Sequence, residues 1–473
     1  MANQLKSIKL KLLKLNVYIY YGLKLIMARL FNSDSNFIKR VVYYPAISDL
    51  GILADVVNRA SWYFPETRLS DVTISIPIKD NLIGTKIECL EHPSSQYNCI
   101  GKNSNINLIS KDMIDLATAD AIMLWDAEHA WDASIIRNLF KVNIVDPYYY
   151  FSVEADTNSR MFYSTLSSNA KNQMIKLSKR NYERLLKKVK KYNCAYVFGT
   201  GPSLDRANEF DYSDGFNLIC NSIVKNNVLL DQIKPHLLVF GDPQFHISLC
   251  NYADAFRKNV LDAVDKYGCY ILTEHYHMPF LLAHYPELSD RLIGIEAPGV
   301  WEMSIREIAE MVLKRPHKIP WFDKIPGHNE KYNLPSLDKF YVRLTGSVLP
   351  SFMIPVASYA CDTVYIIGAD GRDPNGRKPD STYVWSYSPA AQFEDLMQTA
   401  FDTHPSYFRD RPFIDDYDMY CQNFEDLLLY GESISKKYYS LVPSHIPALA
   451  GRFCSNYNGV KHMMEGNVHE FTD

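Results

Sequence analysis

The residues with the clearest chemical potential form a tight turn, Gly199-Thr200-Gly201-Pro202-Ser203, after the apolar run Cys194–Phe198. Two glycines separated by one residue let a backbone approach a ligand closely, and Ser203 can turn its hydroxyl and backbone N–H toward an anion. The turn therefore predicts a loop that binds a nucleotide phosphate or a sugar edge. GxG without a third glycine matches neither a dinucleotide fingerprint nor a P-loop, so a plain surface turn is the alternative.

Three further strand-like runs end on polar groups. They deliver Asn221, then Asp242 before a proline, then Glu274-His275-Tyr276-His277. Parallel strands present their carboxyl ends at one edge of a sheet, where open α/β sheets form their ligand crevice. We therefore expect these groups to line one site together with the glycine turn. Asp before Pro also commonly caps a turn, which is the alternative interpretation of Asp242.

These polar groups must be positioned by α/β units, because short apolar runs alternate with helical segments along most of the chain. The pattern predicts a first Rossmann-like domain over residues 40–150, a helical connector over 151–193 and a second Rossmann-like domain over 194–473. Asp126, Glu128 and His129 follow a strand-like run of the first domain, which we take as the acceptor side. Residues 441–444 form the last strand-like run.

Composition excludes several classes of protein. The 473 residues carry a net charge of −4, so no global basicity points to nucleic acid. The nine cysteines are scattered without a CxxC pair, which indicates neither a disulfide framework nor a zinc site. The compartment expected from this cysteine usage is a reducing one.

Two segments are strongly basic. Residues 1–31 carry six Lys or Arg and no acid, with apolar residues at helical spacing, and they lack an apolar run of the roughly 20 residues needed to span a bilayer. Residues 1–39 are therefore interpreted as a basic amphipathic helix that lies on an anionic membrane or docks on the protein itself. Residues 171–191 form a second basic helix, which is more often a solvated face than a binding surface.

The order of the motifs resembles that of the bacterial sialyltransferases, which use CMP-sialic acid. It consists of a strand into Gly-x-Gly-Pro-Ser-Leu, a strand ending Cys-Asn, a Gly/Ser helix start, Ile-Gly-Ala-Asp-Gly and a closing Val-Pro-Ser. In size and at Asp242 the chain is closer to the retaining β-Kdo transferases of bacterial surface polysaccharides, which use CMP-Kdo. The resemblance covers about residues 194–450 and implies two Rossmann-like domains in a GT-B-like arrangement.

The resemblance also implies roles for individual residues. The turn of residues 199–203 would line the CMP site, with Asn221 near the ribose or donor, Ser347 and Ser444 near the cytidine and phosphate, Tyr383 on the departing phosphate, and Asp370 orienting the loop of the donor site. Asp242 is a carboxylate where the inverting sialyltransferases carry an amide, so it is expected to attack the anomeric carbon and give retention. His275 or His277 would activate the acceptor hydroxyl or orient Asp242.

The implied function is transfer of Kdo from CMP-Kdo to a saccharide acceptor in lipopolysaccharide or capsule synthesis. A single donor phosphate can be stabilised by hydroxyl and backbone donors, so no metal is expected. The expected location is cytoplasmic and peripheral, on the inner face of the membrane. Two alternatives stay open: an inverting transferase that uses CMP-sialic acid with His404 as base, and a noncatalytic nucleotide-binding scaffold of polysaccharide assembly.

Overall fold

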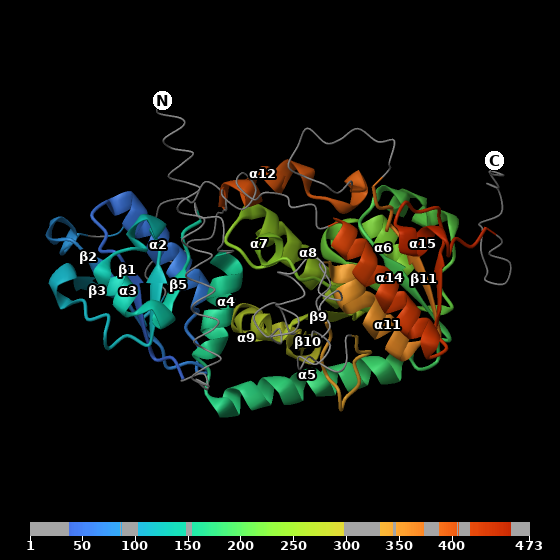
Figure 1. Cartoon of the computed structure of the whole chain (residues 1–473), viewed down its shortest axis with the longest axis horizontal. Helices are drawn as coiled ribbons and strands as arrows, with labels where there is room; N and C mark the ends of the chain where they lie inside the picture. The colour runs from blue at the N-terminus through green and yellow to red at the C-terminus, as the bar shows by residue number, and fades with distance from the viewer. Residues whose placement is uncertain are drawn as a thin grey trace, which may run out of the picture.

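The chain builds two wholly parallel sheets, seen in a computed structural model that describes residues 37–85, 87, 103–147, 154–297, 332–343, 347–372, 387–403, 405 and 417–455 (Figure 1). The first sheet has the strand order β3-β2-β1-β4-β5. Its strands are β1 (Arg40–Tyr44), β2 (Thr73–Ile78), β3 (Ile106–Ser110), β4 (Ala121–Leu124) and β5 (Val142–Ile144). Because β1 lies between β2 and β4, the strand order reverses beside it, as in a Rossmann-like unit.

The second sheet has seven strands in the order β10-β9-β8-β7-β6-β11-β12. They are β6 (Cys194–Phe198), β7 (Gly215–Cys220), β8 (Leu237–Val239), β9 (Tyr270–Glu274), β10 (Leu292–Ile295), β11 (Thr363–Ile367) and β12 (Lys437–Ser440). The order reverses at β6, whose last residue Phe198 lies level with Ile219 of β7 and Ile367 of β11. The glycine turn therefore leaves the sheet at its topological switch point.

Helices connect and cover the strands. In the first unit and the connector they are α2 (Leu50–Tyr63), α3 (Ala133–Arg137), α4 (Glu154–Ser164) and α5 (Ser168–Val189). In the second unit they are α6 (Asn227–Ile233), α7 (Pro243–His246), α8 (Asn251–Tyr267), α9 (Met278–His284), α11 (Ile354–Ala360), α12 (Glu394–Thr403), α14 (Tyr417–Ser433) and α15 (Pro447–Ala450). No helix in these described ranges combines the length and the apolar character needed to cross a bilayer.

The two units pack on each other through α2 and α4, which lie between the two sheets (Figure 1). α4 contacts α2 on one side and α7 and α9 of the second unit on the other. One hydrophobic cluster continues from the first sheet through these helices into the second sheet, and a smaller one fills the outer face of the first sheet under α3. The connector is thus part of the core.

The α/β architecture with two Rossmann-like units is confirmed by these sheets. The basic helix predicted for residues 1–39 falls almost wholly outside the described residues. The last predicted strand is wrong: β12 occupies Lys437–Ser440, and residues 441–444 form the loop after it. Leu441 and Val442 are buried in that loop, which gave the segment its strand-like apolar character.

Candidate functional site

The glycine turn is joined edge to edge with the loop after β11. The Gly199 N–H donates to Ile367 O at 2.8 Å, and the Gly201 N–H donates to Gly368 O at 2.8 Å. A Cβ added at residue 199 would lie 2.3 Å from Gly368 O, and one at residue 201 would lie 2.2 Å from Asp370 Oδ2. Both glycines are therefore required by the close approach of a second loop, before any ligand is considered.

Asp370 fixes this pair of loops. The Ser203 N–H points at both carboxylate oxygens of Asp370, at 3.2 and 3.1 Å, and Ser203 Oγ accepts a hydrogen bond from the Gly368 N–H at 3.1 Å. Ser444 Oγ donates to Ala369 O at 2.6 Å. Burial raises the pKa of Asp370, and the hydrogen bonds from Ser203 oppose that shift. The anion that Ser203 faces in this structure is thus a carboxylate of the chain itself.

Other residues of the predicted donor site lie around these loops. Pro202 begins a 3-10 helix, Pro202–Glu209, and the carbonyl of Thr200 accepts a hydrogen bond from the Ser388 N–H at 2.8 Å. Ser347 lies at the start of the helical segment that leads into α11, where its carbonyl accepts from the Ser351 N–H at 3.0 Å. Tyr383 and His404 lie outside the described residues.

Asn221 follows β7, next to the glycine turn, with a left-handed backbone of φ 47°. This conformation is unusual for a residue other than glycine and is often found where function requires it. The Oδ1 atom of Asn221 is buried and has no hydrogen-bond partner among the described residues. An amide held in this way is suited to accept a hydrogen bond from a ligand hydroxyl or amine.

Asp242 lies just beyond β8, in an exposed position at the N-terminus of α7. Its side chain makes no capping hydrogen bond to that helix. The negative charge of Asp242 raises the pKa of a group at each neighbouring strand end. Burial raises the pKa of Cys220, at the end of β7, to about 12, with a further rise from Asp242. Burial likewise raises the pKa of Glu274, at the end of β9, to about 7, and Asp242 again adds to the rise.

Helix α4 of the connector brings a charged network to the same edge. Arg160 Nε donates to both carboxylate oxygens of Asp156, at 3.2 and 3.1 Å, and the guanidinium lies 3.7 Å from the centre of the Tyr276 ring. The Tyr276 hydroxyl donates to Asp156 at 2.9 Å. Arg160 Nη2 lies 3.6 Å from Glu274 Oε2. The strand end of the second unit is therefore completed by a helix from the connector.

The two predicted histidines differ in their surroundings. His277 is 1% exposed, and its Nδ1 lies 3.0 Å from Ser159 Oγ on α4. Burial lowers the pKa of His277 well below its usual range. His275 is partly exposed, and burial together with the nearby Arg160 lowers its pKa to about 4. Both imidazoles are therefore neutral at pH 7.

Buried polar atoms without partners gather at this edge. Thirteen buried side-chain nitrogen or oxygen atoms have no hydrogen-bond partner within the described part of the chain. Five of them lie at or just beyond the ends of β7 and β9: Asn221 Oδ1, Thr273 Oγ1, Glu274 Oε2, His275 Nδ1 and His277 Nε2. A sixth, His246 Nδ1, lies at the end of α7, the helix that follows β8. Native proteins pair most buried polar groups, so a concentration of unpaired ones marks a place where ligand or water completes the structure.

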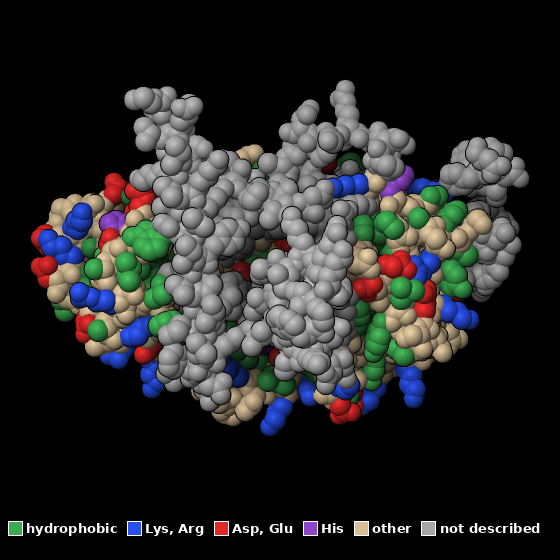
Figure 2. Space-filling model, viewed as in Figure 1, with side chains coloured by type: hydrophobic (Ala, Val, Ile, Leu, Met, Phe, Trp, Pro, Cys, Tyr) green, Lys and Arg blue, Asp and Glu red, His purple; other side chains and the backbone are tan. Residues whose placement is uncertain are grey.

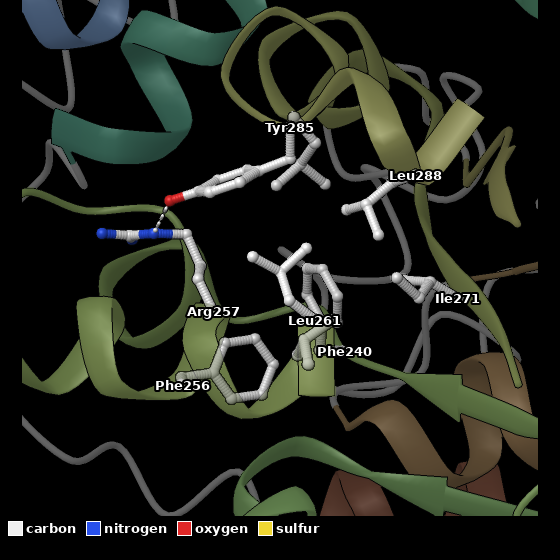
Figure 3. A pocket seen from close by; sticks show the side chains of 9 residues that line it. Phe240, Phe256, Arg257, Leu261, Ile271, Tyr285 and Leu288 are labelled. Atoms are coloured by element: carbon white, nitrogen blue, oxygen red, sulfur yellow. Dashed lines mark hydrogen bonds between the residues drawn. The ribbon is translucent and has the colours of Figure 1, made fainter. Parts of the chain in front are cut away.

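A small cavity elsewhere in the second unit is not the substrate site. The cavity in Figure 3 lies between α8 and α9, where apolar side chains such as Phe240, Leu261 and Ile271 point into it. Its single polar pair is Arg257 Nε donating to the Tyr285 hydroxyl at 3.0 Å. The free volume is about 10 Å³, room for about one water molecule. It is a packing defect of the core and is too small for a nucleotide.

The first sheet carries a polar cluster at its own switch point, after β1 and β4. The Tyr44 hydroxyl donates to Asp132 Oδ2 at 2.6 Å, and His129 Nδ1 lies 2.9 Å from the same oxygen. Asp126 Oδ1 accepts the Glu128 N–H at 3.0 Å and so caps a short 3-10 helix. The structure thus brings the three predicted residues Asp126, Glu128 and His129 together on one turn. This cluster lies on the α3 side of the sheet, away from α4.

Within the described ranges, no group of three or more His, Cys, Asp or Glu side chains is placed to hold a metal ion. Metal-independent chemistry stays a prediction.

Sequence reasoning missed the roles of Arg160 and Asp156, because they lie in a segment interpreted as a connector. Glu274 was expected at this edge but was given no chemical role, which went to the two histidines that follow it, although a carboxylate at a strand end was the signal already used for Asp242.

No protein-family model matches the sequence, and a search of curated proteins found no match. Similar solved structures include the monofunctional α-2,3-sialyltransferase Cst-I from Campylobacter jejuni, at 18% identity, with 58% of this chain and 86% of that chain covered and a TM-score of 0.30. The sialyltransferase CstII from Campylobacter jejuni, in complex with CMP-3FNeuAc, is 14% identical, with 58% and 92% covered and a TM-score of 0.27. Likenesses at this level do not bear on the donor or acceptor of this chain.

Proposed function

We propose that this chain is a glycosyltransferase that uses a CMP-activated sugar. The observation that carries the proposal is the set of unpartnered buried polar atoms at the carboxyl edge of β7–β9, beside a glycine turn at the switch point of the sheet. Open α/β sheets bind nucleotides at such a point. Carboxylates at two adjacent strand ends, Asp242 and Glu274, add the groups that chemistry at an anomeric carbon requires.

The donor in this proposal is CMP-Kdo, and Asp242 is the nucleophile. Its carboxylate attacks C2 of the sugar, the bond from C2 to the phosphate oxygen breaks, and CMP leaves with the bonding electron pair. The acceptor hydroxyl then displaces the aspartyl ester, so that two inversions give retention. The exposed position of Asp242, just beyond β8 and beside the ends of β7 and β9, supports this role.

The acceptor is proposed to be a saccharide of lipopolysaccharide or capsule, held at a membrane surface. One face of α5 and the residues just after it support a membrane contact, because a cation is exposed at nearly every turn: Lys176, Arg180, Arg184, Lys187 and, beyond the helix end, Lys191, here named the basic stripe. Arg180 and Arg184 pair with Asp290, and Lys187 pairs with Glu183, so Lys176 and Lys191 supply the remaining charge. The opposite face of α5 packs on β10. Figure 2 shows Lys and Arg side chains along the lower rim of the molecule, where Figure 1 places α5. Anionic lipid headgroups attract such arrays.

The test is to incubate the purified full-length chain with CMP-Kdo or CMP-sialic acid and to follow CMP release with and without a saccharide acceptor. We expect release from CMP-Kdo, a retained product by NMR, and a sugar-sized mass increment on the wild-type protein that Asp242→Asn lacks. Asp242→Asn should bind CMP normally while transfer falls by orders of magnitude. Release from CMP-sialic acid with an inverted product would favour the His404 mechanism, and no release from either donor would favour a noncatalytic scaffold.

A further inference from the structure

Glu274 is a buried carboxyl group beside the proposed nucleophile. Its side chain is 9% exposed. Strands β8 and β9 are parallel, with Val239 paired to Leu272, and the Phe240 N–H extends the pairing by donating to Leu272 O at 3.2 Å. Two residues further along each strand, the chains reach Gly241 and Glu274. Glu274 and Asp242 are therefore neighbours on the same edge of the sheet.

The surroundings of Glu274 hold it in place without using up its oxygens. Arg160 Nε donates to both oxygens of Asp156, and Arg160 Nη2 donates to the Tyr276 hydroxyl at 2.5 Å. Nη2 therefore reaches Glu274 Oε2 only at 3.6 Å. Glu274 Oε2 accepts no hydrogen bond from any described residue. A carboxylate in a close ion pair would stay ionised throughout a reaction. Glu274 instead keeps an oxygen available for a proton.

We propose that Glu274 is the catalytic base that accepts the proton of the acceptor hydroxyl when that hydroxyl attacks the glycosyl–aspartate ester. This inference rests on the proposed function. In the step, the bond from C2 to the acceptor oxygen forms, the bond from C2 to the Asp242 oxygen breaks, and its electron pair returns to the Asp242 carboxylate. The hydroxyl proton moves to Glu274, which later releases it to water.

The charge on Asp242 changes during the reaction, and this changes the proton affinity of Glu274. Burial is the main cause that raises the pKa of Glu274 to about 7, and Arg160 and the Tyr276 hydroxyl oppose the shift. The charges of Asp156 and, to a smaller extent, Asp242 add to the rise. Formation of the ester removes the charge on Asp242, so the pKa of Glu274 falls at that point. This change favours the ionised form of Glu274 when the acceptor arrives, and the proton affinity of Glu274 rises again as Asp242 is released.

The nearby histidines are less suited to this step. His277 is buried against Ser159, with 1% of its surface exposed. His275 is the better placed of the two, but its pKa of about 4 makes it a weak base at neutral pH. A carboxylate with a pKa near the working pH is a more effective proton acceptor than an imidazole shifted that far.

The experiment compares wild type, Glu274→Gln and Glu154→Gln with CMP-Kdo and a saccharide acceptor. Glu154 is the matched control: burial raises its pKa to about 7 as well, and it lies on α4, but it pairs with Arg59 of α2. For Glu274→Gln we expect a burst of CMP equal to the enzyme concentration, accumulation of the ester by intact-protein mass spectrometry, and transfer lowered by about 100-fold or more. Glu154→Gln removes the charge that pairs with Arg59 and should lower the free energy of unfolding, but the protein that remains folded should transfer within a few-fold of wild type.

Rescue by azide distinguishes loss of the base from loss of the folded structure in Glu274→Gln. Azide attacks the ester without needing a base, so it should restore turnover to Glu274→Gln, with a glycosyl azide as product, and it should not restore Asp242→Asn. A Glu274→Gln enzyme that transfers at more than one-tenth of the wild-type rate, or a folded one that azide does not rescue, overturns the assignment of Glu274 alone. A wild-type chain that releases no CMP overturns the proposed function together with it.

Discussion

Trp62 is predicted to hold the two units together. It lies near the end of α2 in the first unit, is 1% exposed, and donates its indole N–H to Ile247 O in the second unit at 2.9 Å. Its ring stacks on His284 with centroids 4.1 Å apart, and the Arg257 guanidinium lies 4.7 Å from its centre. We expect Trp62→Ala to destabilise the contact between the units more than any exposed aromatic substitution would.

The expected loss can be worked from this geometry. Burial of a tryptophan removes about 150–250 Å² from water, which corresponds to about 4–6 kcal/mol at 25 cal/mol per Å². The hydrogen bond to Ile247 contributes about 1 kcal/mol more. Relaxation around the cavity and burial already present in the unfolded chain reduce the total. We therefore expect Trp62→Ala to lower the free energy of unfolding by about 4 kcal/mol.

The assay is urea unfolding of the full chain, followed by circular dichroism, with calorimetry to show whether the units separate into two transitions. Trp131→Ala is the matched control, because Trp131 belongs to the same unit and is 48% exposed. Its expected cost is within about 0.5 kcal/mol, as for most surface substitutions. A Trp62→Ala protein that loses less than about 1 kcal/mol, or no more than Trp131→Ala, would refute the interpretation of Trp62 as the anchor between the units.

Two other substitutions test the loops and the surface. Gly201→Ala places a Cβ 2.2 Å from Asp370 Oδ2, so thermal unfolding should show a loss of about 1–3 kcal/mol even without CMP. Gly451→Ala, whose Cβ would meet nothing within 4 Å, should be neutral, and equal effects would contradict the packing argument. Lys176→Gln with Lys191→Gln should weaken binding to phosphatidylglycerol vesicles by roughly 30-fold, about 1 kcal/mol per cation. Unchanged binding would remove the basic stripe as a membrane contact.

The central strands of both sheets could be predicted because they are continuous apolar runs bounded by turn residues. Residues 41–44, 121–124 and 363–367 are of this kind, as expected for parallel strands covered on both faces. Two of the edge strands, β3 and β12, lack that signal. β3 and β12 are partly exposed, and the sequence of β12, Lys-Tyr-Tyr-Ser, is no more apolar than a loop. The last strand was therefore predicted at the neighbouring apolar run, residues 441–444, instead of at β12.

The candidate site divides in a similar way. Asn221, Asp242 and the segment at 274–277 were found in the sequence because strand ends are local features, and parallel pairing brings them to one edge. The part that Gly201 plays was not predictable. The turn motif suggests room for a ligand, whereas the structure fills that room with the loop that carries Asp370. Two loops 167 residues apart meet only in the folded sheet.

The position of α4 ties the site to the contact between the units. Arg160 belongs to neither sheet, yet it faces the end of β9 from a helix whose first residue, Glu154, is held by Arg59 of α2 at 2.5 Å. Breaking a buried ion pair costs about 3–5 kcal/mol, because one charge is left without its partner. Any movement of the first unit against the second must therefore carry α4 with it or break that pair. Arg160 would move away from Glu274 in the first case, so the proton affinity of the proposed base depends on how the two units are packed.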